Sequence, residues 1–398
     1  MSCPTTANAT AEDRIWFEQF QIKSLRERVP ISGMLELTRR CNLKCVHCYL
    51  GDQAEQHAKR DQELDTERFK SVIDELADAG CLYLVITGGD PMMRKDFVEL
   101  YLHAIRRGLL VTVFCDGVLV SERIIEVFRE YPPRRVEVSL YGATAETYEA
   151  VTQVRGSFSK CIRGIERLLD AGLNVGLKTV LMTLNQHELE TMREIARGYG
   201  CSFRFDSAIF PCLPDANKDP LDLRVEPRIA VEKELADPET RESWQRYHES
   251  RQGTPNAETL YKCGAGLTGV YVGPLGDLSP CLMTTQHRFS LSDASFEQRW
   301  RHDMLSLRKR KPKRQNYGCN TCEKQTLCTG CPAFNWLETG EEDRKSDYVC
   351  ETTHERWRAL FGDSPPKPAP AYRASTIHPE RQVRSGHPAL PIIKEKKQ

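Results

Sequence analysis

The segment ELTRRCNLKCVHCYL, residues 36–50, contains Cys41, Cys45 and Cys48 directly after a short apolar run that predicts a first β-strand. A loop that leaves a strand can turn such thiolates onto one iron–sulfur cluster, and three protein ligands leave one iron of a four-iron cluster open. Zinc is the main alternative, but structural zinc sites usually need four ligands and favour paired Cys-x-x-Cys units. The segment therefore favours an iron–sulfur cluster with an open iron.

Composition narrows the function further. The chain has 398 residues, 16 cysteines and a formal net charge of zero, so no overall charge favours binding to nucleic acid or to an acidic membrane surface. No apolar run approaches the roughly 20 residues of a membrane span, and residues 1–16 lack the pattern of a secretory signal. We therefore expect a cytoplasmic protein, with no nucleic acid or membrane partner, whose reduced cysteines are free to bind metals.

Residues 34–206 alternate short apolar runs with helical patterns, which is typical of β/α units around a parallel sheet. The predicted strands cover residues 34–38, 83–87, 110–115, 136–140, 175–181 and 203–206. The predicted helices cover residues 66–79, 96–107, 121–130, 158–171 and 187–199. This pattern predicts an α/β fold, a partial (β/α)6 TIM-like barrel, whose ligands bind at the C-terminal ends of the strands.

Short motifs follow these predicted strands. Gly88-Gly89-Asp90 follows the second strand, and its glycines allow the backbone to approach a ligand closely. Ser139 begins the motif Ser-Leu-Tyr-Gly after the fourth strand. Asp206 ends the sixth strand, where it is a candidate either to accept a proton or bind a substrate amine, or to cap a turn.

Together, these motifs resemble the radical S-adenosylmethionine (SAM) superfamily, whose signature is the Cys-x3-Cys-x2-Cys loop after the first barrel strand. The resemblance implies a [4Fe-4S] cluster on the three cysteines, with SAM bound to its open iron. One electron then cleaves SAM to a 5′-deoxyadenosyl radical. The protein's part is to orient the reactive atoms and to exclude water and oxygen.

The resemblance also assigns residues to SAM. It implies that Gly88, Gly89 and Asp90 contact the amino group of SAM, with Asp90 in place of the more usual glutamate. Ser139 faces the ribose or carboxylate of SAM. Arg155 is a candidate to pair with the SAM carboxylate, and a solvated loop arginine is the alternative for this residue.

A second group of cysteines lies between residues 263 and 350 and resembles the SPASM extension of radical SAM enzymes. The resemblance implies two auxiliary [4Fe-4S] clusters. In chain order the first would take Cys263, Cys281 and Cys331, and the second would take Cys319, Cys322, Cys328 and Cys350. The first lacks a fourth cysteine, so it has an open iron, a different ligand, or Cys212. Zinc ribbons are the alternative for the paired cysteines alone.

The chain divides into five predicted segments. They are a helical extension (1–33), the radical SAM barrel (34–210), a linker with one amphipathic helix (211–255), the SPASM domain (256–360) and a disordered, proline-rich tail (361–398). The six remaining cysteines are expected to serve mainly as buried core residues: Cys3, Cys81, Cys115, Cys161, Cys201 and Cys212.

The resemblance favours a maturase that crosslinks a ribosomally made peptide through a thioether or carbon–carbon bond. Its partners would be that peptide and an electron donor such as flavodoxin or ferredoxin. One alternative is a radical SAM enzyme that acts on a tetrapyrrole, as in heme-synthesis decarboxylation, or on another small metabolite. A non-catalytic iron–sulfur or zinc protein is the third hypothesis, and it leaves the SAM-type motifs unexplained.

Overall fold

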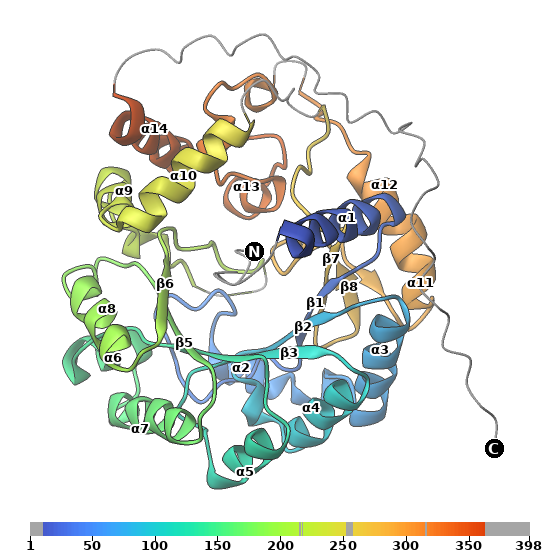
Figure 1. Ribbon diagram of the computed structural model, residues 1–398, viewed down its shortest axis with the longest axis vertical. Coiled ribbons are helices and arrows are strands. Elements are labelled where there is room, and N and C mark those ends of the chain that lie inside the picture. The colour runs from blue at the N-terminus through green and yellow to red at the C-terminus, as the bar shows by residue number, and fades with distance from the viewer. Residues whose placement is uncertain (1–10, 215, 217, 252–257, 315–316, 363–398) are drawn as a thin grey trace.

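The computed structural model describes residues 11–214, 216, 218–251, 258–314 and 317–362. Within these residues one nine-stranded sheet runs in the order β6-β5-β4-β3-β2-β1-β7-β8-β9 (Figure 1). Its strands are β1 (Ser32–Glu36), β2 (Tyr83–Thr87), β3 (Leu110–Cys115), β4 (Arg135–Ser139), β5 (Val175–Val180), β6 (Ser202–Asp206), β7 (Gly269–Val272), β8 (Asp277–Ser279) and β9 (Phe289–Ser290).

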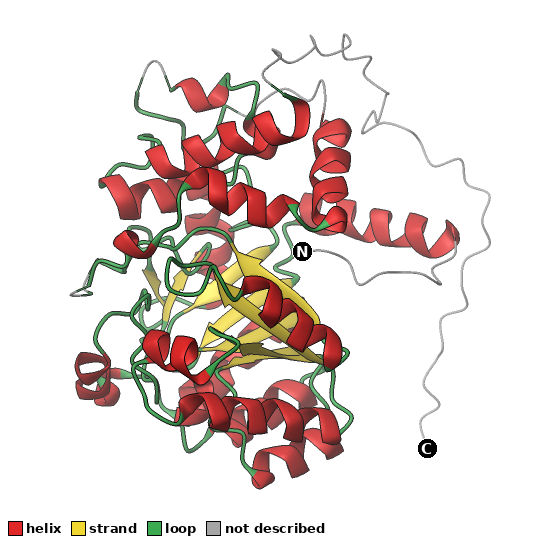
Figure 2. Ribbon diagram, turned by 90° about the vertical axis from the view of Figure 1, so that its left-hand side faces the viewer, coloured by secondary structure: helices red, strands yellow, loops and turns green. Residues whose placement is uncertain are grey.

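Strands β1 to β6 pair in parallel and in chain order, which confirms the predicted α/β fold with a partial barrel. Each predicted strand lies within two residues of the observed one. Five predicted helices are also present, and they cover the outer side of the sheet (Figures 1 and 2). They are α3 (Thr66–Asp78), α4 (Phe97–Arg106), α5 (Glu122–Glu130), α7 (Ser157–Asp170) and α8 (Leu189–Gly198).

Helix α3 shows why these helices form where they do. Asp65 caps its first turn by accepting a hydrogen bond of 2.8 Å from the Arg68 backbone amide. Phe69, Ile73 and Leu76 follow at helical spacing and are fully buried against the sheet. The main apolar core therefore lies between the sheet and these outer helices.

Two further helices lie inside the loops that carry the motifs, and the sequence pattern did not predict them. They are α2 (Gln53–Ala58), after the cysteine segment, and α6 (Ala145–Thr152), after Ser-Leu-Tyr-Gly. Both are shorter than the roughly ten residues over which helical periodicity becomes readable. Short 3-10 turns complete the barrel loops at η1 (Arg60–Gln62), η2 (Pro91–Met93) and η3 (Leu221–Leu223).

The cysteine-rich extension continues the barrel sheet. Strand β7 pairs in parallel with β1, and Met34 lies opposite Tyr271. Strands β8 and β9 then pair in antiparallel fashion at the outer edge. The sheet therefore crosses the predicted boundary between the barrel and the extension.

The segment 211–255 was predicted to hold one helix and contains two, α9 (Pro227–Leu235) and α10 (Pro238–Arg251). The break falls at Asp237-Pro238, where the Asp237 carboxylate accepts a hydrogen bond of 3.1 Å from the Thr240 amide and Pro238 begins the new helix. Both helices gather with α13 (Pro332–Thr339) and α14 (Asp347–Phe361) at one end of the molecule (Figure 1).

A buried arginine holds this group of helices together. Arg356 of α14 is 1% exposed, and its guanidinium pairs with Glu234 of α9 at 2.7 Å. It also donates to the Leu327 carbonyl at 2.7 Å and lies 4.5 Å from the ring centroid of Trp244 on α10. A single charge with these three partners fixes how α9, α10 and α14 pack.

The N-terminal extension contains α1 (Ala11–Glu27), and the Arg28 carbonyl that follows it accepts a hydrogen bond of 2.6 Å from the Trp300 indole. Trp300 belongs to a short helical run of the cysteine-rich extension. Its parts are α11 (Phe296–Gln298), the π-helical turn η4 (Arg299–Asp303) and α12 (Met304–Arg308), and the 3-10 turns η5 (Gly318–Asn320) and η6 (Gln325–Leu327) follow.

Two predictions fall on residues outside the described part of the chain. Cys3 is one of them, and nearly all of the predicted tail, residues 363–398, is the other. Within the described residues, no helix is both long enough and apolar enough to cross a membrane.

Candidate active site

A cavity of about 830 Å³ opens at the C-terminal ends of the barrel strands and extends to the cysteine-rich extension. This volume lies in the range of roughly 300–1,000 Å³ that is usual for small-molecule sites. The cavity brings together half of the sixteen site residues predicted from the sequence: Cys41, Cys45, Cys48, Gly88, Gly89, Ser139, Asp206 and Cys281. The other eight do not line it: Asp90, Arg155, Cys263, Cys319, Cys322, Cys328, Cys331 and Cys350.

The cysteine loop is held in place by its backbone. The amides of Lys44 and Val46 donate to the carbonyls of Thr152 and Val151 at 3.0 and 2.9 Å, which fixes the loop to the end of α6. The Cys41 amide donates to the Gln53 side chain of α2 at 2.7 Å. Both helices that the sequence pattern missed therefore position the cysteine loop.

The three thiols have the features expected of cluster ligands. Burial raises the pKa of Cys41, Cys45 and Cys48 above the usual value for a thiol. A bound cation, such as the iron of a cluster, is therefore needed to stabilise their thiolate forms. The Leu43 amide also donates to the Cys41 sulfur at 3.4 Å, which is the kind of hydrogen bond that tunes iron–sulfur sites. These residues fit an iron–sulfur cluster.

The Gly88-Gly89 edge packs directly on the cysteine loop. The amides of Gly89 and Asp90 donate to the carbonyls of Thr38 and Arg40 at 2.8 and 3.0 Å. A Cβ atom at Gly89 would lie 2.5 Å from the Arg40 carbonyl oxygen, and a Cβ at Gly88 would lie 2.5 Å from that of Thr38. The sequence analysis explained these glycines by approach to a ligand. The structure adds that neither position has room for a side chain beside the loop.

The side chain of Asp90 does not line the cavity, although its motif suggested a contact with the ligand. Its carboxylate is fully buried and accepts hydrogen bonds of 2.9 Å from the backbone amides of Met92 and Asp116. It therefore stabilises the turn after β2 and its junction with β3. Its assignment to SAM stays a prediction.

Asp116 lines the cavity instead, and sequence reasoning gave it no role. It follows β3 directly, and its carboxylate lies 3.9 Å from the Cys41 sulfur. Burial raises the pKa of both Asp90 and Asp116. The available signal was its position after a barrel strand in Cys-Asp-Gly, where the superfamily has Thr-Asn-Gly.

Two aromatic rings pack against each other at the cysteine loop. His47, between two of the cysteines, contacts Tyr141 edge to face with ring centroids 4.6 Å apart, and both line the cavity. Burial, and then the charge of Lys218, lower the pKa of His47 to about 4, so the ring is neutral at neutral pH. Ser139 lies two residues before Tyr141 and also faces the cavity.

The far wall of the cavity is formed by β5 and β6. Lys178, Arg204 and Asp206 all line it, and the sequence pattern did not decide on which face Lys178 lies. Burial, and then the nearby Arg204, lower the pKa of Lys178 to about 7. Arg155, in contrast, is exposed on the turn between α6 and α7.

The two groups of cysteines predicted in the extension stay a prediction, and the influence of neighbouring thiols on Cys331 and Cys319 is consistent with them. Burial, together with the nearby thiols of Cys281 and Cys263, raises the pKa of Cys331 to about 12. Burial likewise raises the pKa of Cys319, with further contributions from the neighbouring thiols of Cys328, Cys322 and Cys350. No three cysteine, histidine, aspartate or glutamate side chains among the described residues converge closely enough to bind one metal ion.

Two details of the extension bear on its ligands. Cys212 donates from its sulfur to the Cys48 carbonyl at 3.4 Å, which places it beside the first cysteine loop. Sulfur atoms of the second group accept hydrogen bonds of 3.3 Å, from the Gly330 amide to Cys328 and from Lys345 to Cys350. Such donors stabilise the thiolate form that a cluster requires.

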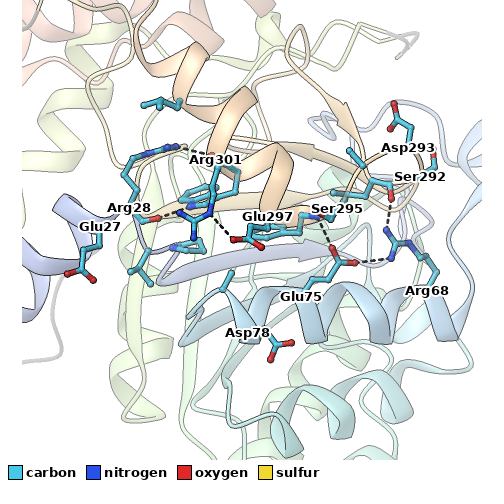
Figure 3. A pocket seen from close by; sticks show the side chains of 18 of the residues that line it. Glu27, Arg28, Arg68, Glu75, Asp78, Ser292, Asp293, Ser295, Glu297 and Arg301 are labelled. Carbon is cyan, nitrogen blue, oxygen red and sulfur yellow. Dashed lines mark hydrogen bonds and ion pairs between the residues drawn. The ribbon is translucent and has the colours of Figure 1, made fainter.

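A second pocket, of about 1060 Å³, lies on the outer side of the barrel between α3, the end of α1 and residues 291–305 (Figure 3). Ion pairs join several of the charged groups that line it, while Asp78 and Asp293 pair with arginines outside it. Arg301 pairs with Glu297 at 2.8 Å, and Arg68 pairs with Glu75 at 3.0 Å. The pocket contains none of the predicted site residues.

Comparison with known proteins places this geometry in context. Residues 35–197 match the family model described as the radical SAM superfamily. The chain is 31% identical over 317 residues to the mycofactocin maturase MftC of Mycolicibacterium smegmatis, which covers 76% of this chain and 77% of the relative. It is 27% identical over 336 residues to the AdoMet-dependent heme synthase of Methanosarcina barkeri, which covers 79% of this chain and 94% of the relative.

The fold also resembles that of Streptococcus suis SuiB in a crystal structure with its precursor peptide SuiA. The TM-score is 0.61 at 15% sequence identity, and the match covers 88% of this chain and 84% of SuiB. At this identity the likeness shows a common fold.

Proposed function

This chain belongs to the radical SAM superfamily, and we propose that it is a maturase that crosslinks a ribosomally synthesised peptide through a thioether or carbon–carbon bond. The observation that carries the proposal is the cavity in which the cysteine loop and the Gly88-Gly89 edge meet residues of the extension, including Cys281. The identity to a maturase over most of both chains supports it.

The superfamily's cofactors, a [4Fe-4S] cluster and SAM, supply a 5′-deoxyadenosyl radical that removes a hydrogen atom from the substrate. We assign the cluster to Cys41, Cys45 and Cys48, and the SAM contacts to Gly88, Gly89 and Ser139, because all of these residues line one cavity. Asp116 joins this set as the carboxylate that faces the cavity beside Cys41. His47 and Tyr141 contact each other edge to face in the cavity wall beside these residues.

The extension would complete the oxidation. Forming a crosslink removes two hydrogen atoms from the peptide: one leaves to the 5′-deoxyadenosyl radical, and the other leaves as a proton and an electron. The two cysteine groups are proposed to hold auxiliary [4Fe-4S] clusters that accept this electron, with Cys281 at the cavity wall. A flavodoxin or ferredoxin is the proposed donor of the electron that cleaves SAM.

A tetrapyrrole substrate is the second candidate. It is favoured by the identity to the AdoMet-dependent heme synthase, because the match covers 94% of that protein. The same cavity and the same cysteine loop would serve this reaction. The two proposed functions therefore differ in the substrate, a peptide or a tetrapyrrole, that occupies the space between the loop and β5.

The intact mass of a short peptide encoded beside this gene tests the proposal after anaerobic co-expression with the enzyme. We expect a loss of two hydrogen atoms from the peptide, and no loss with the Cys41→Ala variant, which lacks one ligand of the first cluster. A peptide of unchanged mass with the wild-type enzyme would contradict the maturase and favour the tetrapyrrole.

A further inference from the structure

An unpaired lysine lies in the wall of the cavity. Lys178 is the fourth residue of β5, and its side chain lines the cavity. Its ammonium makes no hydrogen bond and no ion pair of 4 Å or less with any residue that the structure describes. Its close neighbour is instead the Phe114 ring, whose centroid lies 3.3 Å from the Lys178 nitrogen.

A second cation shares this ring. Arg204 of β6 lies opposite Lys178 in the strand register, and its guanidinium carbon is 5.7 Å from the Phe114 centroid. Arg204 pairs with Glu137 at 3.3 Å, but Glu137 also pairs with Arg135 at 3.0 Å. One carboxylate is thus shared by two guanidinium groups, and Lys178 is left without an anion of its own.

Lys178 has one cationic neighbour, Arg204, and two carboxylates, Glu137 and Asp206, in its surroundings. Four charged or titratable groups influence its ammonium: Arg204 and Asp206 from β6, Glu137 from β4 and Cys115 from β3. Glu137 is engaged by the two arginines, and Asp206 lies opposite Val180 in the register. Lys178 is half-buried and has no anion within ion-pair distance, so an anion that enters the cavity lowers the cost of holding its charge away from water.

From this arrangement we propose that Lys178 and Arg204 form a subsite that binds a carboxylate of the substrate. The inference deepens the proposed function and rests on it for the peptide case, where the carboxylate is the C-terminus or an acidic side chain. A tetrapyrrole offers the same group on its propionates. The subsite selects acidic substrates and holds them in the cavity that the cysteine loop also lines.

The proposal predicts a pH dependence of binding. The pKa of Lys178, lowered to about 7 in the free protein, means that the ammonium loses its proton as the pH rises through 7. Affinity for a carboxylate should therefore weaken above pH 7. Lys178→Arg keeps its charge over this range and should remove the dependence.

The experiment measures binding by calorimetry to the anaerobically reconstituted, full-length protein with SAM present. The first pair of probes consists of the co-expressed peptide and a neutral form of it. The neutral form has a C-terminal amide, and Asn and Gln replace its acidic residues. The other pair is a tetrapyrrole with propionate side chains and its methyl ester. Wild type is compared with Lys178→Met, Lys178→Arg and the matched control Lys160→Met, which removes an exposed lysine of α7.

We expect one acidic probe to bind the wild type about 10- to 100-fold more tightly than its neutral partner. This preference should vanish in Lys178→Met and persist in Lys178→Arg and Lys160→Met. Equal affinity of the wild type for the acidic and neutral probe of both pairs, or an intact preference in Lys178→Met, would overturn the subsite. A preference that strengthens with rising pH would also contradict it, since the neutral amine would then be the binding form.

The two probe pairs separate this inference from the proposed function. If the peptide is crosslinked but Lys178→Met binds its acidic and neutral forms as the wild type does, the maturase stands and the subsite is wrong. If no peptide is modified and only the propionate pair shows a preference that depends on Lys178, the subsite stands and the maturase is wrong.

Discussion

The outer pocket and the cavity at the strand ends are similar in size and differ in the groups that line them. The outer pocket, of about 1060 Å³, is rimmed by ion pairs such as Arg301 with Glu297 and Arg68 with Glu75 (Figure 3). The cavity at the strand ends, of about 830 Å³, contains the thiols of Cys41, Cys45 and Cys48 and the ammonium of Lys178, which has no ion pair among the described residues. The cysteine loop and Lys178, rather than volume, therefore distinguish the cavity at the strand ends from the outer pocket.

The largest effect that this comparison predicts comes from Gly89→Ala. The new Cβ would lie 2.5 and 2.6 Å from the backbone oxygens of Arg40 and Arg39, so the cysteine loop must move. A shift of about 1 Å at a reacting centre can cost on the order of 100-fold in rate. We expect a loss of this size in 5′-deoxyadenosine formation, measured by chromatography with dithionite as reductant.

Gly198→Ala is the matched control for this change. Gly198 ends α8, and a Cβ there meets nothing within 4 Å. We expect unchanged 5′-deoxyadenosine formation and a gain of roughly 0.5–1 kcal/mol in stability. Wild-type activity in Gly89→Ala would show that close packing of the glycine edge on the loop is not needed.

An intermediate effect is expected at Glu342, a buried carboxylate that is fully paired, unlike Lys178. It accepts hydrogen bonds from Tyr261 at 2.6 Å, His287 at 2.8 Å and Gln286 at 3.0 Å. Although burial raises its pKa, these bonds outweigh burial and hold the pKa below the usual value. Glu342→Gln should therefore destabilise the protein by about 1.5–3 kcal/mol at neutral pH.

The pH dependence of this effect has a definite sign. Because the folded protein holds Glu342 ionised, its contribution is complete above pH 4.5, the usual value for glutamate, and is lost as the pH falls below it. The difference in thermal midpoint between wild type and Glu342→Gln should therefore shrink in acid. A difference that grows below pH 4.5 would contradict the assigned direction.

The smallest effect is expected in the outer pocket. The Arg301 and Glu297 side chains are 68% and 71% exposed, so their ion pair contributes about 0.5 kcal/mol or less. Arg301→Ala should leave the thermal midpoint and 5′-deoxyadenosine formation close to the wild-type values. A tenfold loss of activity in this variant would mean that the outer pocket takes part in the reaction.

The barrel was predictable from the sequence because its strands are compact apolar runs and its helices are long enough to show periodicity. The cysteine loop and the Gly88-Gly89 edge were predictable because their chemistry depends on residues close together in the chain. Helices α2 and α6 were not, because each is short and its role is to support a loop. The pairing of β7 with β1 joins segments more than 200 residues apart, which no local pattern reports.

The sequence predicted Asp206 in the cavity, but the proximity of Lys178 and Arg204 could be found only after the strand register was known. Lys178 and Arg204 are 26 residues apart in sequence and become direct neighbours through the pairing of β5 with β6. Asp90 and Asp116 show the opposite case. The motif pointed to Asp90, whose contact with SAM stays a prediction and whose carboxylate accepts two backbone hydrogen bonds, whereas no motif pointed to Asp116, which lines the cavity.

The measurement that tests the central claim most directly is 5′-deoxyadenosine formation by the anaerobically reconstituted enzyme with SAM and dithionite. Cys201→Ala is the control, because it removes a half-buried thiol outside the three cysteine groups. We predict 5′-deoxyadenosine from the wild type and from Cys201→Ala, and none from Cys41→Ala, which should still retain the iron of the extension. Cleavage of SAM by Cys41→Ala at the wild-type rate would contradict the assignment of the first cluster to this loop.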